Sequence, residues 1–367
     1  MRWVRRSTVL AALVPCAIAG MPLRAPAEQR PDVVRGVVRS HGVAVPYAVV
    51  ELVGLRGKQF SDDSGTFAFA GVPAGPVRLR VRQVGYRPFD ATVEKSGGRP
   101  LVVPVELEPL VIELAAITID VPRACALPGR PDSALAPELA ALLDQLRQNA
   151  ERFAFLSDSY PFHYRLSRAF ADYDDAGRVV WSAGDTVRYL SSAQVRYRPG
   201  QVLAFGQGPE HSMSKVIRLP TLSDFADSAF QSNHCFYYAG TVARDSGRIV
   251  RFDFVPVDSL RMPDIEGEVD LDARSFQIRS ATVRLTRVGR AMPGLISTSS
   301  TISFAELYPN IVVPSHMEGQ LVPAPRFDVR TPIARSTEIQ QLLDVHFVRP
   351  LPTARPPGNA GGDGGHH

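Results

Sequence analysis

Short segments in which hydrophobic and polar residues alternate dominate the chain between residues 33 and 108. The clearest is Val77–Arg82, where three apolar residues alternate with three arginines. A period of two places the apolar side chains on one face of a β-strand. We expect strands at Val33–Val38, Tyr47–Val53, Thr66–Ala70, Val77–Arg82, Phe89–Val93 and Leu101–Leu107. Together with the Gly-, Pro- and Asp-rich turns between them, the pattern predicts about seven strands and a β-sandwich.

Five short blocks in this region have a recognisable order and spacing: Gly36–Val38, Val45–Leu52, Ser61–Phe69, Val72–Gly75 and Val84–Tyr86. They resemble the carboxypeptidase regulatory-like domain, a transthyretin-like β-sandwich, over residues 30–110. The resemblance implies a non-catalytic accessory module of exported proteins, without peptidase activity.

Four residues in those blocks have expected structural roles. Asp63 and Gly65 are expected to turn the chain, since Asp bonds nearby amides and Gly accepts a positive φ. Gly85 permits a bend before Tyr86, whose ring we expect to be buried while its hydroxyl finds a partner.

Pro137–Phe155 has the period of a helix. Proline suits a first helical position, and a set of apolar residues recurs at helical spacing. That set is Leu139, Leu142, Leu143, Leu146, Ala150 and Phe153, and the polar residues Asp144, Gln145, Gln148 and Glu151 largely lie elsewhere. We therefore predict a helix that covers a sheet with one face.

Strand patterns return from Phe162 to Phe347, with a hairpin turn at Asp174–Gly177 and a short helix at Leu222–Phe230. The fold class is thus mainly β, with a larger antiparallel domain at residues 135–349. A helix followed by a long meander is similar to the half-barrel of lipoprotein-carrier proteins. The resemblance implies a concave face that binds an acyl chain or another hydrophobic ligand. The alternative is a face filled by Phe252, Phe254, Leu271 and Ile278.

The segments outside these domains are connectors and termini. Leu110–Val121 is apolar and β-prone, so it either pairs as a last strand or enters a linker at residues 111–134. Residues 350–367, rich in Pro, Gly and Ala, are expected to be a disordered tail.

The first residues predict export. Three arginines precede an apolar run, and Ala25–Ala27 has the pattern of a signal-peptidase site, so residues 1–27 are a predicted signal peptide. The apolar run is shorter than a membrane span of about 20 residues. Lipidation at Cys16 is an alternative, although Pro15 replaces the small residue expected there. We expect no transmembrane helix in the mature chain and a location in the periplasm or at the outer membrane.

Removing the leader changes the charge balance. The chain has 41 basic and 37 acidic residues, and the leader contains four arginines and no acids. The mature chain is therefore neutral, which removes the compositional support for nucleic-acid binding.

Two cysteines remain after cleavage, Cys125 and Cys235. An even number of cysteines in an oxidising compartment favours a disulfide over two free thiols. In that case Cys235 is structural and the neighbouring His234 packs near it rather than forming a thiol–imidazole pair.

No motif for catalysis, a metal or a cofactor stands out. No histidine begins the H-x-x-E pair of a zinc carboxypeptidase. Ser212–Lys215 matches S-x-x-K, which works as a nucleophile and base on a helix, but it lies in a polar region. The aspartates of Asp172–Gly177 and Ser61–Gly65 suit turns rather than calcium loops. The arginines of Val77–Arg82 suit a solvated sheet face, or contact with anionic lipid or polysaccharide.

These observations predict a non-catalytic protein of the cell envelope, with a recognition or spacer module and a second β domain. The partner is an envelope component, whether protein, polysaccharide or lipid. Two alternatives are a periplasmic carrier of a hydrophobic ligand and a hydrolase with an unrecognised site.

Overall fold

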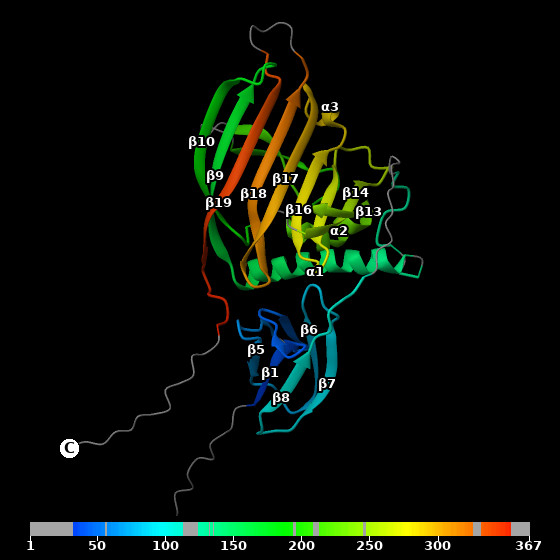
Figure 1. The fold of residues 1–367 in the computed structure, drawn as a ribbon, viewed down its shortest axis with the longest axis vertical. Coiled ribbons are helices and arrows are strands. Elements are labelled where there is room, and N and C mark those ends of the chain that lie inside the picture. Colours follow the sequence, from blue (N-terminus) through cyan, green and yellow to red (C-terminus); the bar gives the residue numbers. More distant parts are fainter. Residues whose placement is uncertain are drawn as a thin grey trace, which may run out of the picture.

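Two β-sheet bodies lie on opposite sides of one long helix (Figure 1). The smaller, N-terminal body has two four-stranded sheets, and the larger has a nine-stranded antiparallel sheet. The predicted mainly-β fold class is confirmed. The structure is a computed structural model that describes residues 32–55, 57–112, 124–131, 133–134, 136–193, 196–207, 213–244, 247–325 and 332–353.

The N-terminal body is a β-sandwich. Its strands are β1 Val33–Ser40, β2 Val43–Ala44, β3 Val49–Val53, β4 Gly57–Phe60, β5 Thr66–Ala70, β6 Gly75–Arg82, β7 Phe89–Lys95 and β8 Leu101–Glu106. One sheet has the order β2–β1–β5, with β8 parallel to β1, and the other has the order β4–β3–β6–β7. The apolar residues of β6 are buried in a core that both sheets share, as their alternation predicts.

The carboxylate of Asp62 helps to hold the turn before β5. The Oδ1 atom of Asp62 accepts hydrogen bonds from the backbone amides of Ser64 and Thr66, at 2.9 and 2.7 Å. Gly65 has a φ of 78°, and a Cβ there would lie 2.6 Å from the carbonyl oxygen of Val38. The turn is where the sequence places it, and Asp62 is a further carboxylate that takes part in it.

The long helix is α1, Pro137–Ser159, one turn longer than predicted. Its apolar face packs into the core of the large body, as expected. The polar face differs from the expectation, because Gln145 and Gln148 are only 2% and 5% exposed. The reason is that the sandwich packs against this face: Gln145 Oε1 accepts a hydrogen bond of 2.8 Å from the Gly85 amide. Both faces of α1 are therefore interfaces.

The nine-stranded sheet curves over α1 in the order β10–β9–β19–β18–β17–β16–β15–β14–β13. Because β19 inserts between β9 and β18, the last strand of the chain lies beside the first strand of this sheet. The strands are β9 Phe162–Tyr173, β10 Val179–Leu190, β13 His234–Arg244, β14 Gly247–Pro256, β15 Ile265–Asp272, β16 Ile278–Leu285, β17 Leu295–Tyr308, β18 Ile311–Pro323 and β19 Arg335–Phe347. The smaller elements are β11 Leu203–Gln207, β12 Met213–Ile217, the 3₁₀ helix η2 Leu222–Ala226, α2 Ser228–Asn233 and α3 Val288–Ala291.

Gly85 and Tyr86 lie where the sandwich meets the large body. Gly85 has a φ of 84°, and a Cβ there would lie 2.7 Å from the carbonyl oxygen of Ser275. Tyr86 is partly buried against the sandwich core. The close approach at Gly85 explains why a larger residue does not suit this position.

Several predictions concern residues at the ends of the described ranges. The predicted leader, Cys16 and residues 113–123 of the linker lie outside them. Leu110–Ile112 forms no strand. Leu351, at the start of the predicted tail, is 8% exposed and belongs to the core.

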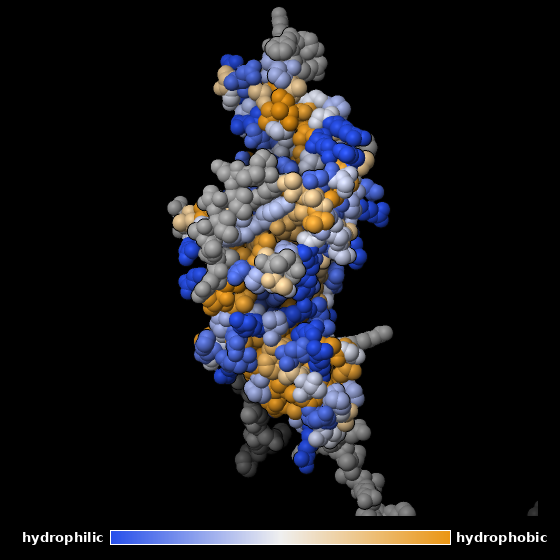
Figure 2. All heavy atoms as spheres, turned by 90° about the vertical axis from the view of Figure 1, so that its right-hand side faces the viewer, coloured by the Kyte–Doolittle hydropathy of each residue, from blue (hydrophilic) through white to orange (hydrophobic). Residues whose placement is uncertain are grey.

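Among the described residues, no helix has the length and apolar character needed to cross a bilayer. Hydrophilic and hydrophobic residues are interspersed over the face that Figure 2 shows.

Candidate functional site

The concave face of the nine-stranded sheet is filled with side chains at one end. Phe252, Phe254, Leu271 and Ile278, on β14 to β16, are each at most 1% exposed. They form one core with Leu142, Leu146 and other residues of α1. At this end the filled alternative predicted from the sequence is correct.

The other end of the same face contains a cavity of about 230 Å³. Its wall is built by β9, β17, β18 and β19, whose alternate residues share one face of the sheet. The wall residues are Phe162, Tyr164 and Leu166 of β9, Ile302 and Phe304 of β17, Val313, Ser315 and Met317 of β18, and Gln340, Leu342 and Val345 of β19. Phe153 of α1 and the segment Leu219–Leu222 close the cavity from the other side.

No residue that lines this cavity is Asp, Glu, Lys or Arg. Two of its hydroxyls are engaged by the backbone: Ser191 Oγ accepts from the Phe162 amide at 3.0 Å, and Ser315 Oγ donates to the Ser303 carbonyl at 3.2 Å. Burial raises the pKa of Tyr164 to about 12, so its hydroxyl stays neutral at physiological pH. The cavity therefore offers a mostly apolar environment, and His316 is also among its lining residues.

The volume sets what the cavity accommodates. An apolar cavity of about 150 Å³ in another protein stays dry and binds benzene. The cavity here is larger, so an apolar segment of a ligand fits it. It is also smaller than the ~300 Å³ or more that encloses a whole drug-sized ligand.

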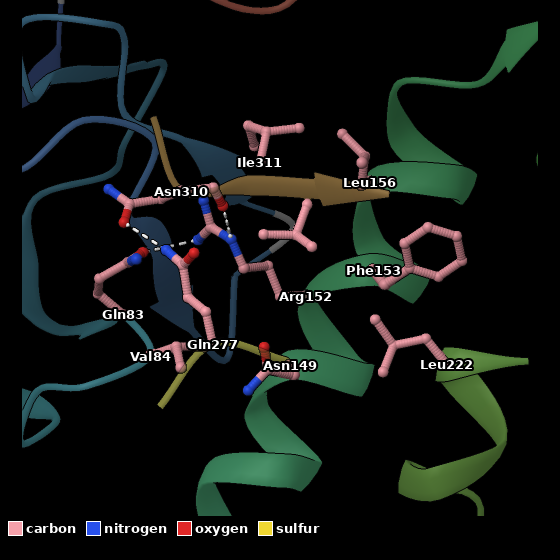
Figure 3. Close-up of a pocket in the computed structure, with 11 residues that line it drawn as sticks. Gln83, Val84, Asn149, Arg152, Phe153, Leu156, Leu222, Gln277, Asn310 and Ile311 are labelled. Carbon is pink, nitrogen blue, oxygen red and sulfur yellow. Dashed lines mark hydrogen bonds between the residues drawn. The ribbon is translucent and has the colours of Figure 1, made fainter. Parts of the chain in front are cut away.

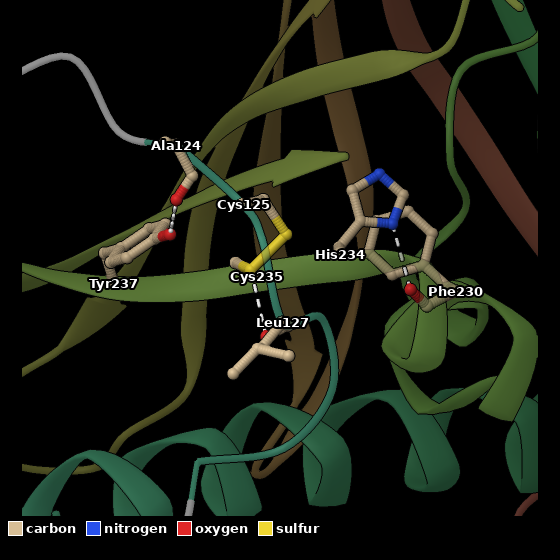
Figure 4. Close-up of a disulfide and its surroundings, with 7 residues drawn as sticks. All are labelled: Ala124, Cys125, Leu127, Phe230, His234, Cys235 and Tyr237. Carbon is tan, nitrogen blue, oxygen red and sulfur yellow. Dashed lines mark hydrogen bonds between the residues drawn. A yellow bond between two sulfur atoms is a disulfide. The ribbon is translucent and has the colours of Figure 1, made fainter. Parts of the chain in front are cut away.

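Cys125 and Cys235 form a disulfide, with Cα atoms 5.5 Å apart (Figure 4). The bridge fixes the segment before α1 on the edge strand β13, where Tyr237 Oη also donates to the Ala124 carbonyl at 2.6 Å. With both sulfur atoms bonded to each other, neither cysteine is a nucleophile.

His234 is fully buried beside this bridge. Its ring stacks on Phe230 with centroids 4.1 Å apart, and its Nδ1 and Nε2 lie 2.9 and 3.0 Å from the carbonyl oxygens of Phe230 and Ile265. A neutral imidazole has one N–H, so it donates to one of these carbonyls. Burial lowers the pKa of His234, and this effect outweighs the carbonyls and Asp264, which act in the opposite direction. The packed, structural role predicted for His234 agrees with this position.

The lowered pKa of His234 predicts a pH dependence of stability. The folded state binds the proton more weakly than the unfolded chain, whose histidine pKa is about 6.5. The contribution of His234 is therefore complete above about pH 6.5 and is lost as the pH falls toward the folded-state pKa. We expect the unfolding midpoint in urea to fall between about pH 7 and pH 5, and to fall less in a His234→Gln variant. His346→Gln, at a side chain that is 73% exposed, is the control; equal pH slopes in His234→Gln and the wild type would contradict the prediction.

The remaining residues singled out from the sequence do not gather at one site. Asp63 and Gly65 lie in a sandwich turn, Gly85 and Tyr86 at the junction, and the cysteines near β13. Ser212 lies outside the described residues, and the backbone at Lys215 belongs to β12, a strand rather than the helix that S-x-x-K requires. Among the residues that the structure describes, no group of three or more His, Cys, Asp and Glu is arranged to hold a metal.

The three arginines of β6 are paired with carboxylates. Arg78 and Arg80 both contact Asp90, each with a shortest distance of 2.8 Å. Arg82 reaches across the junction to Glu151 of α1, also at 2.8 Å. The stripe is therefore partly an interface, in contrast to the fully solvated face expected from the alternation.

The sequence pattern did not identify the residues that line the cavity as a candidate site. The alternation that places Tyr164 and Leu166 on one face of β9 is visible in the sequence, but β14 and β15 show the same alternation and their apolar residues belong to the packed core. The strands of the cavity wall differ in that their pairing contains register shifts, in β17 with β18 and in β19 with β9, which the sequence pattern does not reveal.

Comparisons with known proteins agree with the N-terminal assignment. Residues 33–108 match the family model of the carboxypeptidase regulatory-like domain, which confirms that prediction. No curated protein matches the chain. A solved LolA superfamily protein from Nitrosomonas europaea is 14% identical, with 57% of this chain and 94% of that chain covered and a TM-score of 0.31. A DUF1329 family protein from Desulfovibrio piger is 10% identical, with 56% and 93% covered and a TM-score of 0.32.

Proposed function

We propose that this chain, whose residues 33–108 form a carboxypeptidase regulatory-like domain, binds a hydrophobic ligand of the acyl-chain type in the cavity under β9 and β17 to β19. The observation that supports this most is the lining of the cavity, in which no side chain is Asp, Glu, Lys or Arg. An acyl chain gains about 0.8 kcal/mol for each methylene that leaves water. Since most of the sheet's concave face is closely packed, the cavity is a local feature of one end.

The sandwich acts in this proposal as a non-catalytic module that is fixed to the binding body. Support comes from its contacts with α1, among them Gly85 with Gln145 and Arg82 with Glu151. We assign no chemical step to the cavity, because the Ser191 and Ser315 hydroxyls already bond to the backbone. The predicted leader and the disulfide support a location in the periplasm or at the outer membrane.

Native mass spectrometry of the full chain, exported and purified from a bacterial host, tests the binding function. We expect a co-purified lipid, or a 1:1 adduct after addition of palmitate or a phospholipid with one acyl chain. The fluorescence of cis-parinaric acid should also rise on mixing and saturate. A protein that carries no lipid and takes up neither probe would overturn the proposal.

A further inference from the structure

Three elements from different parts of the chain meet at the junction of the sandwich and the large body. Gln83 comes from the segment after β6, Arg152 from α1, and Asn310 from the turn between β17 and β18 (Figure 3). Their side chains line a cavity of about 20 Å³. Gln83 and Arg152 also line a second cavity of about 20 Å³ at the same junction. The lining of this junction differs from that of the apolar cavity, because it includes several polar and charged side chains.

The hydrogen bonds and the ring contact of the Arg152 guanidinium are all with neutral groups. Its Nε donates to the Asn310 carbonyl at 2.8 Å, its Nη1 donates to Gln83 Oε1 at 2.7 Å, and its Cζ lies 4.9 Å from the centre of the Phe60 ring. Among the described residues, no carboxylate lies within ion-pair distance of Arg152. A charged group held away from water is costly when no opposite charge compensates it. Burial lowers the pKa of Arg152 to about 9, and the Glu306 carboxylate, which lies beyond ion-pair distance, acts in the opposite direction.

Two hydrogen-bond donors remain without a protein acceptor in the described part of the junction. They are the Nη2 of Arg152 and the Nε2 of Gln83, a residue that is 2% exposed. The orientation of the Gln83 amide follows from its partner, since Oε1 accepts from Arg152 and Nε2 is therefore the free donor. Both side chains line both small cavities, so one acceptor placed there can meet both donors.

The side chains that line the second cavity carry more positive than negative charge. They include Lys58, Arg82 and Arg152 and a single acid, Glu151, which is already bonded to Arg82 and Arg147. Glu51 is not part of the lining but lies 3.8 Å from Arg82. Burial, followed by the neighbouring Arg82, lowers the pKa of Lys58. A positive surrounding with two free N–H donors favours an anion over a neutral acceptor such as water.

We propose that the junction binds one small monovalent anion of the size of chloride, between Gln83 Nε2 and Arg152 Nη2. The ion supplies the acceptor that both donors lack, adds to the negative charge that Glu306 places near Arg152, and links the sandwich to α1. The size follows from the volume of about 20 Å³ for each cavity, which by this measure is the space of one water-sized particle. Phosphate, sulfate and the head group of a lipid are therefore excluded as occupants.

Bromide, which has the charge and nearly the size of chloride, identifies the site directly. Crystals of the full mature chain grown in sodium bromide should show an anomalous peak within hydrogen-bond distance of both Gln83 Nε2 and Arg152 Nη2. A peak at this position supports the proposal. Density for water without an anomalous signal overturns it.

Thermal unfolding tests the same site in solution. Sodium chloride is titrated against sodium gluconate at constant ionic strength, because gluconate is too large for the cavity. We expect a saturable rise of the midpoint of about 2 °C. An unchanged midpoint, or a rise that does not saturate, overturns the proposal.

The Gln83→Glu variant places the negative charge in the protein itself. The glutamate has the shape of glutamine and can pair with Arg152, so the midpoint in gluconate should rise and the response to chloride should disappear. The control is Gln59→Glu, the same change at an exposed hydrogen-bonding side chain of β4, which should keep the chloride response. A full chloride response in Gln83→Glu would show that chloride binds elsewhere and would overturn the proposal.

Discussion

Replacing Leu342 by tryptophan is expected to remove most of the affinity for an acyl chain while leaving the fold intact. Leu342 lies half-buried on the cavity wall, and the larger indole extends into the space that the ligand would occupy. Excluding only two methylenes from the cavity costs about 1.6 kcal/mol, which is more than a tenfold loss in affinity. A cavity accepts added volume without the overpacking strain of a filled core, so the unfolding temperature should not fall.

Titration with cis-parinaric acid, together with circular dichroism and a thermal melt, measures both effects. The matched control is Ile339→Trp on the same strand, where the side chain is 41% exposed and lies on the opposite face from Gln340 of the cavity wall. Equal affinities of Leu342→Trp and Ile339→Trp would show that the ligand does not occupy this cavity. Met317→Trp, on the neighbouring strand β18, offers an independent repeat of the test.

The predictable part of the fold is the part that depends on local sequence patterns. The alternation of apolar and polar residues predicted β6, because Val77, Leu79 and Val81 share one face only in a β-strand. Helical spacing located α1, and the five blocks located the sandwich that the family comparison confirms. These features depend on residues close together in the chain.

The features that escaped prediction depend on contacts between distant residues. Gln145 looks like a solvated residue of α1 until the sandwich, more than fifty residues away in sequence, presents the Gly85 amide to it. The insertion of β19 beside β9 joins strands from the two ends of the domain, and no local pattern encodes this pairing. The cavity depends on the same pairing, since Leu166 of β9 and Leu342 of β19 meet only there. The position of the cavity in this fold therefore depends on strand order and curvature rather than on a sequence motif.

The loss of the disulfide is expected to cause the largest change in stability. The bridge between Cys125 and Cys235 joins residues 110 positions apart. Closing a loop of this length restricts the unfolded chain and contributes about 4–5 kcal/mol in the chain-entropy model. Its loss also weakens the attachment of the segment before α1. In the folded protein the Gly129 amide of this segment donates to the His234 carbonyl of β13 at 3.0 Å, and its Cys125 carbonyl accepts from the Asp258 amide. The Cys125→Ser, Cys235→Ser double variant should therefore lose a large share of the free energy of unfolding, which is commonly 5–15 kcal/mol for a protein.

Urea unfolding of the double variant and of the wild type, with and without a reducing agent, measures this loss. The reduced wild type should have a urea midpoint close to that of the double variant. The reducing agent should not change the midpoint of the double variant, which therefore controls for other effects of the reducing agent. Non-reducing peptide mapping identifies the linked pair directly. Free thiols at both positions of the exported protein, or an unchanged urea midpoint in the double variant, would contradict the prediction. Because the bridge attaches the segment before α1 to the edge of the nine-stranded sheet, its loss should also weaken the support of Phe153, the α1 residue that closes the cavity.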